Sequence, residues 1–466
     1  MQKSDCSYDN LPAEAGTKSI ILKGWVSISI FFYIASNNAN RGVSLKFNSM
    51  HKAFLIFAAF CFTSFAKGQD HIKRYVQMNT IKVLTIEPDS FDYSDLEEIG
   101  KSIGNSKIVM LGEQDHGDAP TFLAKTRLIK YLHEKKGFNV IAFESDFFGL
   151  NFGWDNLFKT PENVSKFIRQ NIFPIWTGCD ACRQLFNYIP DSYNTSNPIA
   201  VTGFDNQMIL SYSSNYLVSK LDSVLKSVNL PITKQENYRT QILPLIDSMP
   251  LWYFRSPKDS TFFSRCGKYL VEIKKQAEQK LNKNDYWMVI IENLIQENIT
   301  YQTAKSDRRF ASNTRDYQMA SNLKWLSENK YPNEKIIVWA ANTHVAKYAD
   351  STISKNKVIA MGSFFTRDSS LMNNTYIIGF TSYEGEAGRL GKKNYAIQKP
   401  RSNSFETWIN EKYDYAFVDF KNYTKIFPNK ADKFFLKGLA HSNFKNEWTK
   451  IFDGIFYIKK MYPCQK

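Results

Sequence analysis

The chain has 466 residues, of which 43% are hydrophobic and 15% are aromatic. This composition supports a large buried core and excludes disorder over most of the length. The net charge is +15, but the basic residues are scattered, and no basic block interleaved with aromatic residues suggests a nucleic-acid groove.

The first part of the chain carries a secretion signal in an unusual internal position. Residues 50–68 combine a short basic start, an apolar stretch and the small-residue ending Ala66-Lys67-Gly68, the pattern of a signal peptide. We therefore predict that residues 1–49 are a mis-annotated or disordered extension and that the mature, exported protein starts near Gln69. The alternative is a genuine N-terminal extension with a membrane anchor. Outside these segments no run is long enough to span a bilayer.

The next segments alternate between strand-like and helical patterns. Their order is an extended stretch at 81–86, a helix at 93–103, a strand at 108–111, a helix at 121–135 ended by Gly137, and a strand at 139–143. The last three form a strand–helix–strand unit, which implies parallel strands joined by a right-handed crossover.

The rest of the chain predicts a helical insertion within an α/β core. Helical, aromatic-rich sequence at 147–188 precedes a strand at 198–205, and the long charged segment 208–330 contains little that suits a buried strand. Further strands are predicted at 336–341, 357–361, 376–380, 413–420 and 454–458. We therefore expect an α/β fold with a mostly parallel sheet flanked by helices, a core of 69–207 and 331–466, and a helical subdomain at 208–330.

Candidate catalytic residues follow three of these strands. Glu113 and His116 lie in the Gly-bounded loop after the first strand, Glu144 ends the second, and His344 follows the strand that begins at Ile336. Ligands of open α/β sheets bind outside the carboxyl ends of the strands. A histidine beside a carboxylate is suited to general-base catalysis, so this pattern predicts an enzyme, although His116 serving only to stabilise its loop is the alternative.

Other charged residues are candidates for binding substrate. Lys125 and Arg127 lie on the helix after the first loop, where either could stabilise an oxyanion or be a surface cation. Arg315 and Asp316 lie on a long helix that either reaches the same crevice or exposes a solvated pair, and Asp205 ends its strand. The other histidines of the mature chain are expected to be structural: His71, His133 and His441.

Motif absences narrow the chemistry. The sequence has no Gly-x-Ser-x-Gly elbow, no His-Glu-x-x-His, no Walker loop and no Gly-x-Gly-x-x-Gly, which disfavours a serine hydrolase and nucleotide binding. We expect no cofactor and no metal. A metal-dependent hydrolase or transferase that uses Glu113, His116, Glu144 and His344 as ligands is the second interpretation, and a non-catalytic envelope binding protein is the third.

The mature chain would keep four cysteines, namely Cys179, Cys182, Cys266 and Cys464. Cys179 and Cys182 have the spacing of a metal knuckle, but no second such pair exists, so a zinc site is poorly supported. A disulfide is the better interpretation for an exported protein, and the pairing is not readable from the sequence.

These stretches together resemble the erythromycin esterase family. The similarity covers most of residues 105–385 and includes the GEQDHG loop, the helix with Lys125 and Arg127, and Gly137-Phe138 leading to Glu144. It continues with Gly203-Phe204-Asp205, Arg315-Asp316 with Met319 and Asn322, Trp339-Ala-Ala-Asn-Thr-His344 and, weakly, Tyr376 to Phe380.

The resemblance implies metal-independent hydrolysis of an ester or macrolactone by water, in a cleft between the core and the helical part. His116 would be the general base with Glu113 as its neighbour, Glu144 would orient or activate water, and His344 would assist the oxyanion or leaving group. Asn342 would join Lys125, Arg127, Asp205, Arg315 and Asp316 in substrate binding. Family members often carry a histidine where this chain has Ala341 and an arginine where it has Lys125. We expect a monomer or dimer that acts on a small-molecule substrate.

Overall fold

The computed structural model describes residues 71–253, 257, 259–347 and 358–466. The predictions for 1–49 and 50–68 therefore lie outside the described residues. The described residues belong to one compact unit, Gly68–Lys466. Within them, no helix is both long and apolar enough to cross a membrane.

A mostly parallel sheet forms the centre of this unit, in the strand order β1-β8-β11-β6-β2-β5-β3-β4, with β7 paired to β6. The six strands from β11 to β4 are mutually parallel, whereas β8 is antiparallel to β11. The strands are β1 Ile81–Val83, β2 Ile108–Leu111, β3 Phe138–Asp146, β4 Ala200–Asp205, β5 Lys335–Trp339, β6 Thr375–Ala387, β7 Tyr395–Ala396, β8 Tyr415–Asp419 and β11 Gly454–Met461. The predicted α/β class is confirmed.

Both faces of the sheet are buried, because alternate residues of each strand enter different cores. In β2, Ile108 and Met110 belong to one hydrophobic cluster, and Val109 and Leu111 belong to the other. Continuous apolar runs of this kind are expected where helices cover both sides of a parallel sheet.

The second face is covered mainly by helices that precede β4 in the chain. These are α3 Glu97–Ile103, α4 Ala119–Lys136, α5 Pro161–Asn171, α6 Pro174–Thr177 and α7 Arg183–Asp191. Helix α4 connects β2 to β3 and ends at Gly137, whose φ of 73° is the left-handed conformation that glycine adopts without strain. The predicted strand–helix–strand unit is therefore present.

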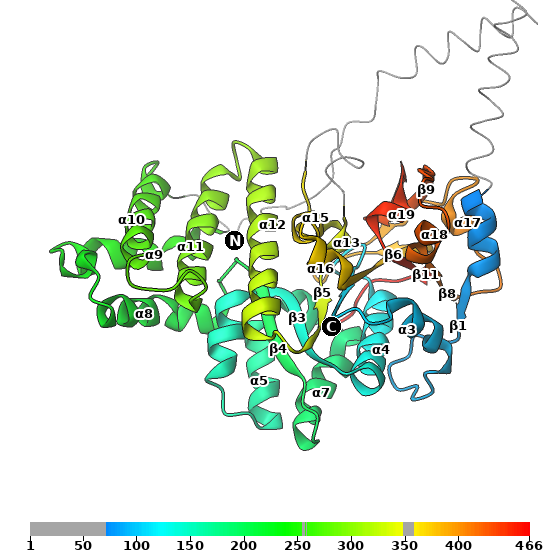
Figure 1. The fold of residues 1–466 in the computed structure, drawn as a ribbon, viewed down its shortest axis with the longest axis horizontal. Coiled ribbons are helices and arrows are strands. Elements are labelled where there is room, and N and C mark those ends of the chain that lie inside the picture. Colours follow the sequence, from blue (N-terminus) through cyan, green and yellow to red (C-terminus); the bar gives the residue numbers. More distant parts are fainter. Residues whose placement is uncertain (1–70, 254–256, 258, 348–357) are drawn as a thin grey trace, which may run out of the picture. The chain divides into compact units, whose positions relative to one another are not determined.

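Between β4 and β5 the described chain is helical. It contains α8 Ser211–Ser227, α9 Leu243–Asp247, α10 Phe262–Ala277, α11 Tyr286–Thr303 and α12 Arg308–Trp325. Figure 1 shows α8 to α11 grouped beside the sheet, with α12 between that group and the strands. Helix α12 packs directly on β4 and on α15 Met361–Phe365. Helix α12 thus anchors the insertion to the core.

Two features after β5 differ from the predicted pattern. The strand expected at 357–361 is absent among the described residues 358–361, because the N–H groups of Ile359 and Met361 donate to side chains of α12 and not to a neighbouring strand. The chain also forms an unpredicted two-stranded sheet, β9 Phe434–Leu439 and β10 Ser442–Asn446. The short helices of this region are α13 Asn342–Val345, α16 Ser369–Asn373, α17 Phe405–Trp408, α18 Phe420–Ile426 and α19 Trp448–Ile451.

Candidate active site

The strand order gathers the three candidate loops at one edge of the sheet. Strand β5 lies between β2 and β3 and is parallel to both. The loops after β2 and β5 and the end of β3 are therefore direct neighbours, although β5 lies far along the sequence from the other two. Glu113, Glu144 and His344 consequently meet at the carboxyl ends of adjacent strands.

The first pair consists of Glu113 and His116. The Nδ1 atom of His116 lies 2.8 Å from Oε1 of Glu113, and the imidazole remains partly accessible while the carboxylate is fully buried. A carboxylate accepts hydrogen bonds, so the proton of the neutral imidazole is held on Nδ1. The lone pair then lies on Nε2, which is the arrangement a general base requires.

Two further donors complete the surroundings of Glu113. The Lys125 ammonium donates to Oε2 at 2.6 Å, and the Trp176 indole N–H donates to Oε1 at 3.0 Å. Lys125 is fully buried and lies 3.8 Å from the centre of the Trp339 ring. Burial lowers the pKa of Lys125, although the Glu113 charge opposes this effect. The ammonium of Lys125 therefore compensates the negative charge of the buried Glu113 carboxylate.

The second carboxylate, Glu144, lies at an irregularity in β3. The pairing register between β3 and β4 shifts between Phe143 and Asp146, as in a β-bulge, a feature that often redirects side chains beside active sites. Its Oε1 atom lies 3.0 Å from Arg315 and 3.3 Å from His344 Nε2, and its Oε2 accepts from the Ala341 N–H at 3.1 Å. Three different segments therefore fix this carboxylate.

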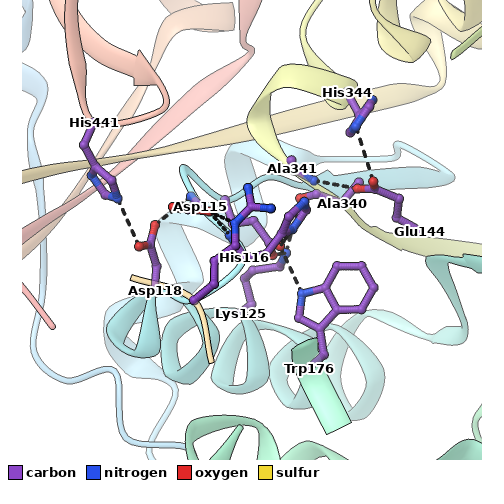
Figure 2. A network of polar contacts seen from close by, with 12 residues as sticks. Asp115, His116, Asp118, Lys125, Glu144, Trp176, Ala340, Ala341, His344 and His441 are labelled. Carbon is purple, nitrogen blue, oxygen red and sulfur yellow. Dashed lines mark hydrogen bonds and ion pairs between the residues drawn. The ribbon is translucent and has the colours of Figure 1, made fainter. Parts of the chain in front are cut away.

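The charges around Glu144 keep it ionised. Burial would raise its pKa, but His344, His116, Arg315 and the Ala341 N–H bring the pKa of Glu144 down to about 2. Both histidines thus lie close enough to act on one carboxylate. Figure 2 shows Glu144 between His344 and the Ala340–Ala341 backbone, with His116 and Trp176 on the other side of that backbone.

His344 lies between two carboxylates. Its Nδ1 is 2.7 Å from Asp316 Oδ1, while its Nε2 faces Glu144. Burial lowers the pKa of an imidazole, but Asp316 and Glu144 outweigh it and raise the pKa of His344 to about 9. His344 is therefore an imidazolium at neutral pH, suited to donate a proton or stabilise negative charge and unsuited to act as a base.

Arg315 joins the insertion to this site. Its guanidinium binds Asp205 through Nε at 3.1 Å and Nη2 at 2.7 Å, and the same Nη2 reaches Glu144. Its side chain is 20% exposed, whereas Asp205 is fully buried. Asp205 therefore orients Arg315, while Arg315 keeps some access to a ligand.

Three residues predicted to bind substrate occupy other positions. The buried Lys125 contacts Glu113, as described above. Arg127 points away from the site and forms two bonds with Asp95, together with bonds to the carbonyls of Thr85 and Asp92. Asn342 is also fully buried, so all three bind protein groups in this structure, and their contact with substrate stays a prediction.

Asn342 ties the loop after β5 to its neighbours. Its side-chain N–H₂ donates to the carbonyls of Phe380 and Gly438, both at 2.8 Å, and its Oδ1 accepts from the Phe380 N–H. A Cβ at Gly112 would lie only 2.0 Å from that Oδ1. The glycine before Glu113 is therefore required for close approach of this side chain.

A second network holds the GEQDHG loop from its other side. Asp118 accepts from the Asp115 N–H at 2.9 Å, and its other oxygen lies 3.0 Å from His441 Nε2. The Nδ1 of His441 in turn contacts Ser382. This serine, histidine and aspartate form a chain, but all three are buried, which supports a structural role as predicted for His441. Figure 2 shows the contact between Asp118 and His441.

Sequence reasoning missed three residues that contact the site loop. Trp176 reaches Glu113 from an aromatic-rich helical segment, in which no motif distinguishes it. Arg389 donates to Asp115 at 2.5 Å from a loop 274 residues further along the chain, and Tyr395 Oη donates to the same carboxylate at 2.8 Å. Only the three-dimensional pairing of β6 with β2 brings that loop near.

The four proposed metal ligands form two separate pairs. Among the described residues, the group of histidine, cysteine and carboxylate ligands close enough to share one ion is Cys179, Asp180 and Cys464. Cys179 and Cys464 are joined by a disulfide, and Cys182 is a buried free thiol. In this structure the four residues therefore pair as His116 with Glu113 and His344 with Glu144.

The fold and site define an α/β protein with a histidine-based polar centre at the carboxyl ends of its strands. The erythromycin esterase family model matches residues 133–461, which is more than half of the chain. The chain therefore belongs to the erythromycin esterase family, and the hydrolase class is supported. The matched range begins after Glu113 and His116 and includes Glu144 and His344.

Two curated relatives agree with this assignment. The chain is 26% identical over 364 residues to "Putative hydrolase YbfO" of Bacillus subtilis, covering 71% of this chain and 78% of the relative. It is 22% identical over 430 residues to the erythromycin esterase type II of Escherichia coli, covering 80% and 94%.

Solved structures share the fold. A succinoglycan biosynthesis protein matches with a TM-score of 0.63 and 22% identity, covering 85% of this chain and 98% of the other. The erythromycin esterase mutant EreC in its open conformation matches with a TM-score of 0.60 and 17% identity, covering 82% and 98%.

Proposed function

We propose that this protein hydrolyses an ester or macrolactone by direct attack of water that His116 activates. The observation that carries the proposal is the different surroundings of the two histidines. His116 is held with Nε2 as acceptor, while His344 is kept protonated between Glu144 and Asp316. One site thus offers a base and an acid at once.

Each group has a defined task in the proposed reaction. His116 Nε2 takes a proton from water as that water attacks the carbonyl carbon. The His344 imidazolium and the Arg315 guanidinium stabilise the negative charge that develops on oxygen, and His344 donates its own proton to the leaving alkoxide. Proton exchange with solvent then restores neutral His116 and protonated His344. Glu144 stays ionised and orients both cations, which it already contacts.

Within the hydrolase class, we propose a macrolactone or a simpler ester as the substrate. Membership of the family and the similarity to an erythromycin esterase of Escherichia coli favour a macrolactone or a simpler ester. Ala341 and Lys125 replace residue types that family members often carry, so the proposal includes esters other than macrolides.

Hydrolysis of p-nitrophenyl acetate and of erythromycin A tests the proposal, with His116→Ala as the matched variant. We expect kcat/KM to fall about 10²–10⁴-fold in the variant, the usual contribution of a general base. In water enriched in ¹⁸O, the label should enter the acid product without an acyl-enzyme detectable by mass spectrometry. Equal rates for both proteins on every ester tried would favour the non-catalytic interpretation. Activity that is lost together with a stoichiometric metal would favour the metal-dependent one.

We further propose that the protein is exported. The Cys179–Cys464 disulfide supports this location, because disulfides persist in oxidising compartments. Amino-terminal sequencing of protein recovered outside the cytoplasm tests it, with a start near Gln69 as the expected result. An intact start at Met1 would contradict both the location and the signal peptide.

A further inference from the structure

Trp176 touches both members of the proposed base. Its indole N–H donates to Glu113 Oε1 at 3.0 Å, the same oxygen that His116 contacts at 2.8 Å. Its ring also meets the His116 ring edge-on, with centroids 5.5 Å apart and planes at 84°. Trp176 is 1% exposed, so this geometry is fixed by packing.

The turn that carries Trp176 is fastened to the catalytic loop by a second segment, residues 462–465. On one side, Tyr462 accepts from the Ala119 N–H at 3.1 Å and the Cys464 N–H donates to Gly117 at 2.8 Å. On the other, Gln465 accepts from the Asp180 N–H at 2.9 Å. The Cys179–Cys464 disulfide closes this connection three residues after Trp176. We refer to residues 462–465 as the strap.

From these contacts we infer that Trp176 is a positioning residue for the Glu113–His116 base, and that the strap and its disulfide keep Trp176 in place. The inference rests on the proposed function of His116. A hydrogen bond from the indole spreads the charge of Glu113 and limits how strongly it holds the imidazolium form of His116. It also orients the carboxylate so that His116 Nε2 faces the reacting water.

Other titratable groups surround the Glu113–His116 pair, but they act on it differently from Trp176. Lys125 on α4 binds the opposite oxygen of Glu113, and buried Cys182 lies near both. Glu144 on β3 and Asp115 in the loop act electrostatically on His116. Trp176 is the uncharged donor on Oε1, and its removal therefore changes the hydrogen bonding of Glu113 without changing the charge of the site.

Trp176→Phe tests the inference, because phenylalanine keeps an aromatic ring and lacks the N–H. We expect the imidazolium form of His116 to gain stability, since Glu113 would then bind it more strongly. The acid limb of kcat/KM should move to higher pH by about 0.5–1 unit, with kcat at pH 7 reduced about tenfold and KM changed less than twofold. Trp448→Phe is the control, because Trp448 is equally buried and its N–H bonds to Phe434 O, outside the site.

The pKa of His116 is measured by NMR titration of histidine-labelled protein, with His116→Gln assigning the signal. This readout does not need activity. A shift in Trp176→Phe alone supports the inference even when wild type cleaves no ester, an outcome that would refute only the proposed function. An identical titration in wild type and Trp176→Phe overturns the inference, whatever the activity. So does an equal shift in Trp448→Phe.

A second variant covers the case in which Trp176→Phe does not fold. Cys179→Ser combined with Cys464→Ser removes the disulfide and substitutes no residue of the site. We expect kcat to fall about three- to tenfold with KM retained, since small displacements of catalytic groups reduce rates steeply, and the His116 titration should broaden or shift. Wild-type kcat and an unchanged His116 titration in this variant would overturn the role of the strap.

Discussion

The two histidine–carboxylate pairs at the edge of the sheet contain the same chemical groups and differ in how many charges surround each one. The His116 ring is hydrogen-bonded to one carboxylate, that of Glu113, which also accepts from Lys125 and Trp176. His344 lies between two carboxylates, Glu144 and Asp316. The comparison indicates that the number of carboxylates in contact with each imidazole, more than the residue type, distinguishes the proposed base from the proposed acid.

Position in the fold explains this difference. Glu113 lies after β2, at the start of the loop that α4 closes, and α4 contributes the ammonium of Lys125. His344 lies after β5 and faces α12, which contributes both Asp316 and Arg315. The core therefore builds the first pair, whereas the helical insertion completes the second.

The largest effect is expected from Lys125→Met, which removes the counter-charge of the first pair. Glu113 would remain buried without an ionic partner, and breaking a buried ion pair on one side typically costs about 3–5 kcal/mol of folding free energy. We expect loss of most activity and a large fall in stability, measured by kcat/KM and by urea denaturation.

A second substitution separates the loss of activity from the loss of stability. Adding Glu113→Gln to Lys125→Met removes both charges, so most of the stability should return while activity stays low, because Gln cannot hold His116 as a carboxylate does. A double variant as unstable as Lys125→Met would contradict the charge-compensation role of Lys125.

A smaller effect is expected from Asp316→Asn, which leaves His344 with one carboxylate. The pKa of about 9 should fall toward that of an ordinary histidine. The alkaline limb of activity should then move down by about one pH unit. Activity at pH 8.5 should fall about threefold, because the protonated fraction of His344 falls by that factor when its pKa drops by one unit, with little change at pH 6, as measured by rate profiles from pH 5 to 10.

The pH dependence of folding stability should also depend on the titration of His344. Because the pKa of His344 is raised on folding from 6.5 to about 9, its ion pairs stabilise the native state fully below pH 6.5. This contribution is lost as pH rises through 9. Asp316→Asn should reduce that alkaline loss, as measured by thermal unfolding across the same range. An unchanged alkaline limb in the variant would show that His344 is not the titrating acid.

Much of the fold could be predicted because buried parallel strands are short apolar runs. The sequences of β2, β3, β5 and β6 have this form, and the strand ends led directly to Glu113, Glu144 and His344. The run at 357–361 looked the same, but side chains of α12 bind its backbone. Strand β10, Ser442–Asn446, was missed because it is polar and only partly buried.

The site residues that directly follow a strand could be predicted from the sequence. The residues that reach the site from distant parts of the chain could not. Trp176 and Arg389 lie in segments without a motif, and each reaches the loop only after folding. The substrate-binding role of Arg127 stays a prediction, but in the structure its guanidinium binds Asp95 and two carbonyls away from the site loop. Residues two positions apart on an α-helix point in roughly opposite directions, about 200° apart. Lys125 and Arg127 could therefore not both face the site, and helical geometry alone carries that information.

The smallest effect on turnover is expected from Arg127→Gln, which tests the two cations of α4 against each other. Arg127 holds Asp95 and two carbonyls on the side of the helix away from the site. Its loss leaves the buried Asp95 carboxylate without its ionic partner and with the Leu84 N–H as a remaining donor, so stability should fall by about 3–5 kcal/mol. At a temperature where the variant remains folded, kcat and KM should match wild type within about twofold. A selective rise in KM would instead show that Arg127 binds substrate, and α4 would then have to turn before the reaction, since both cations cannot face the cleft in the arrangement described above.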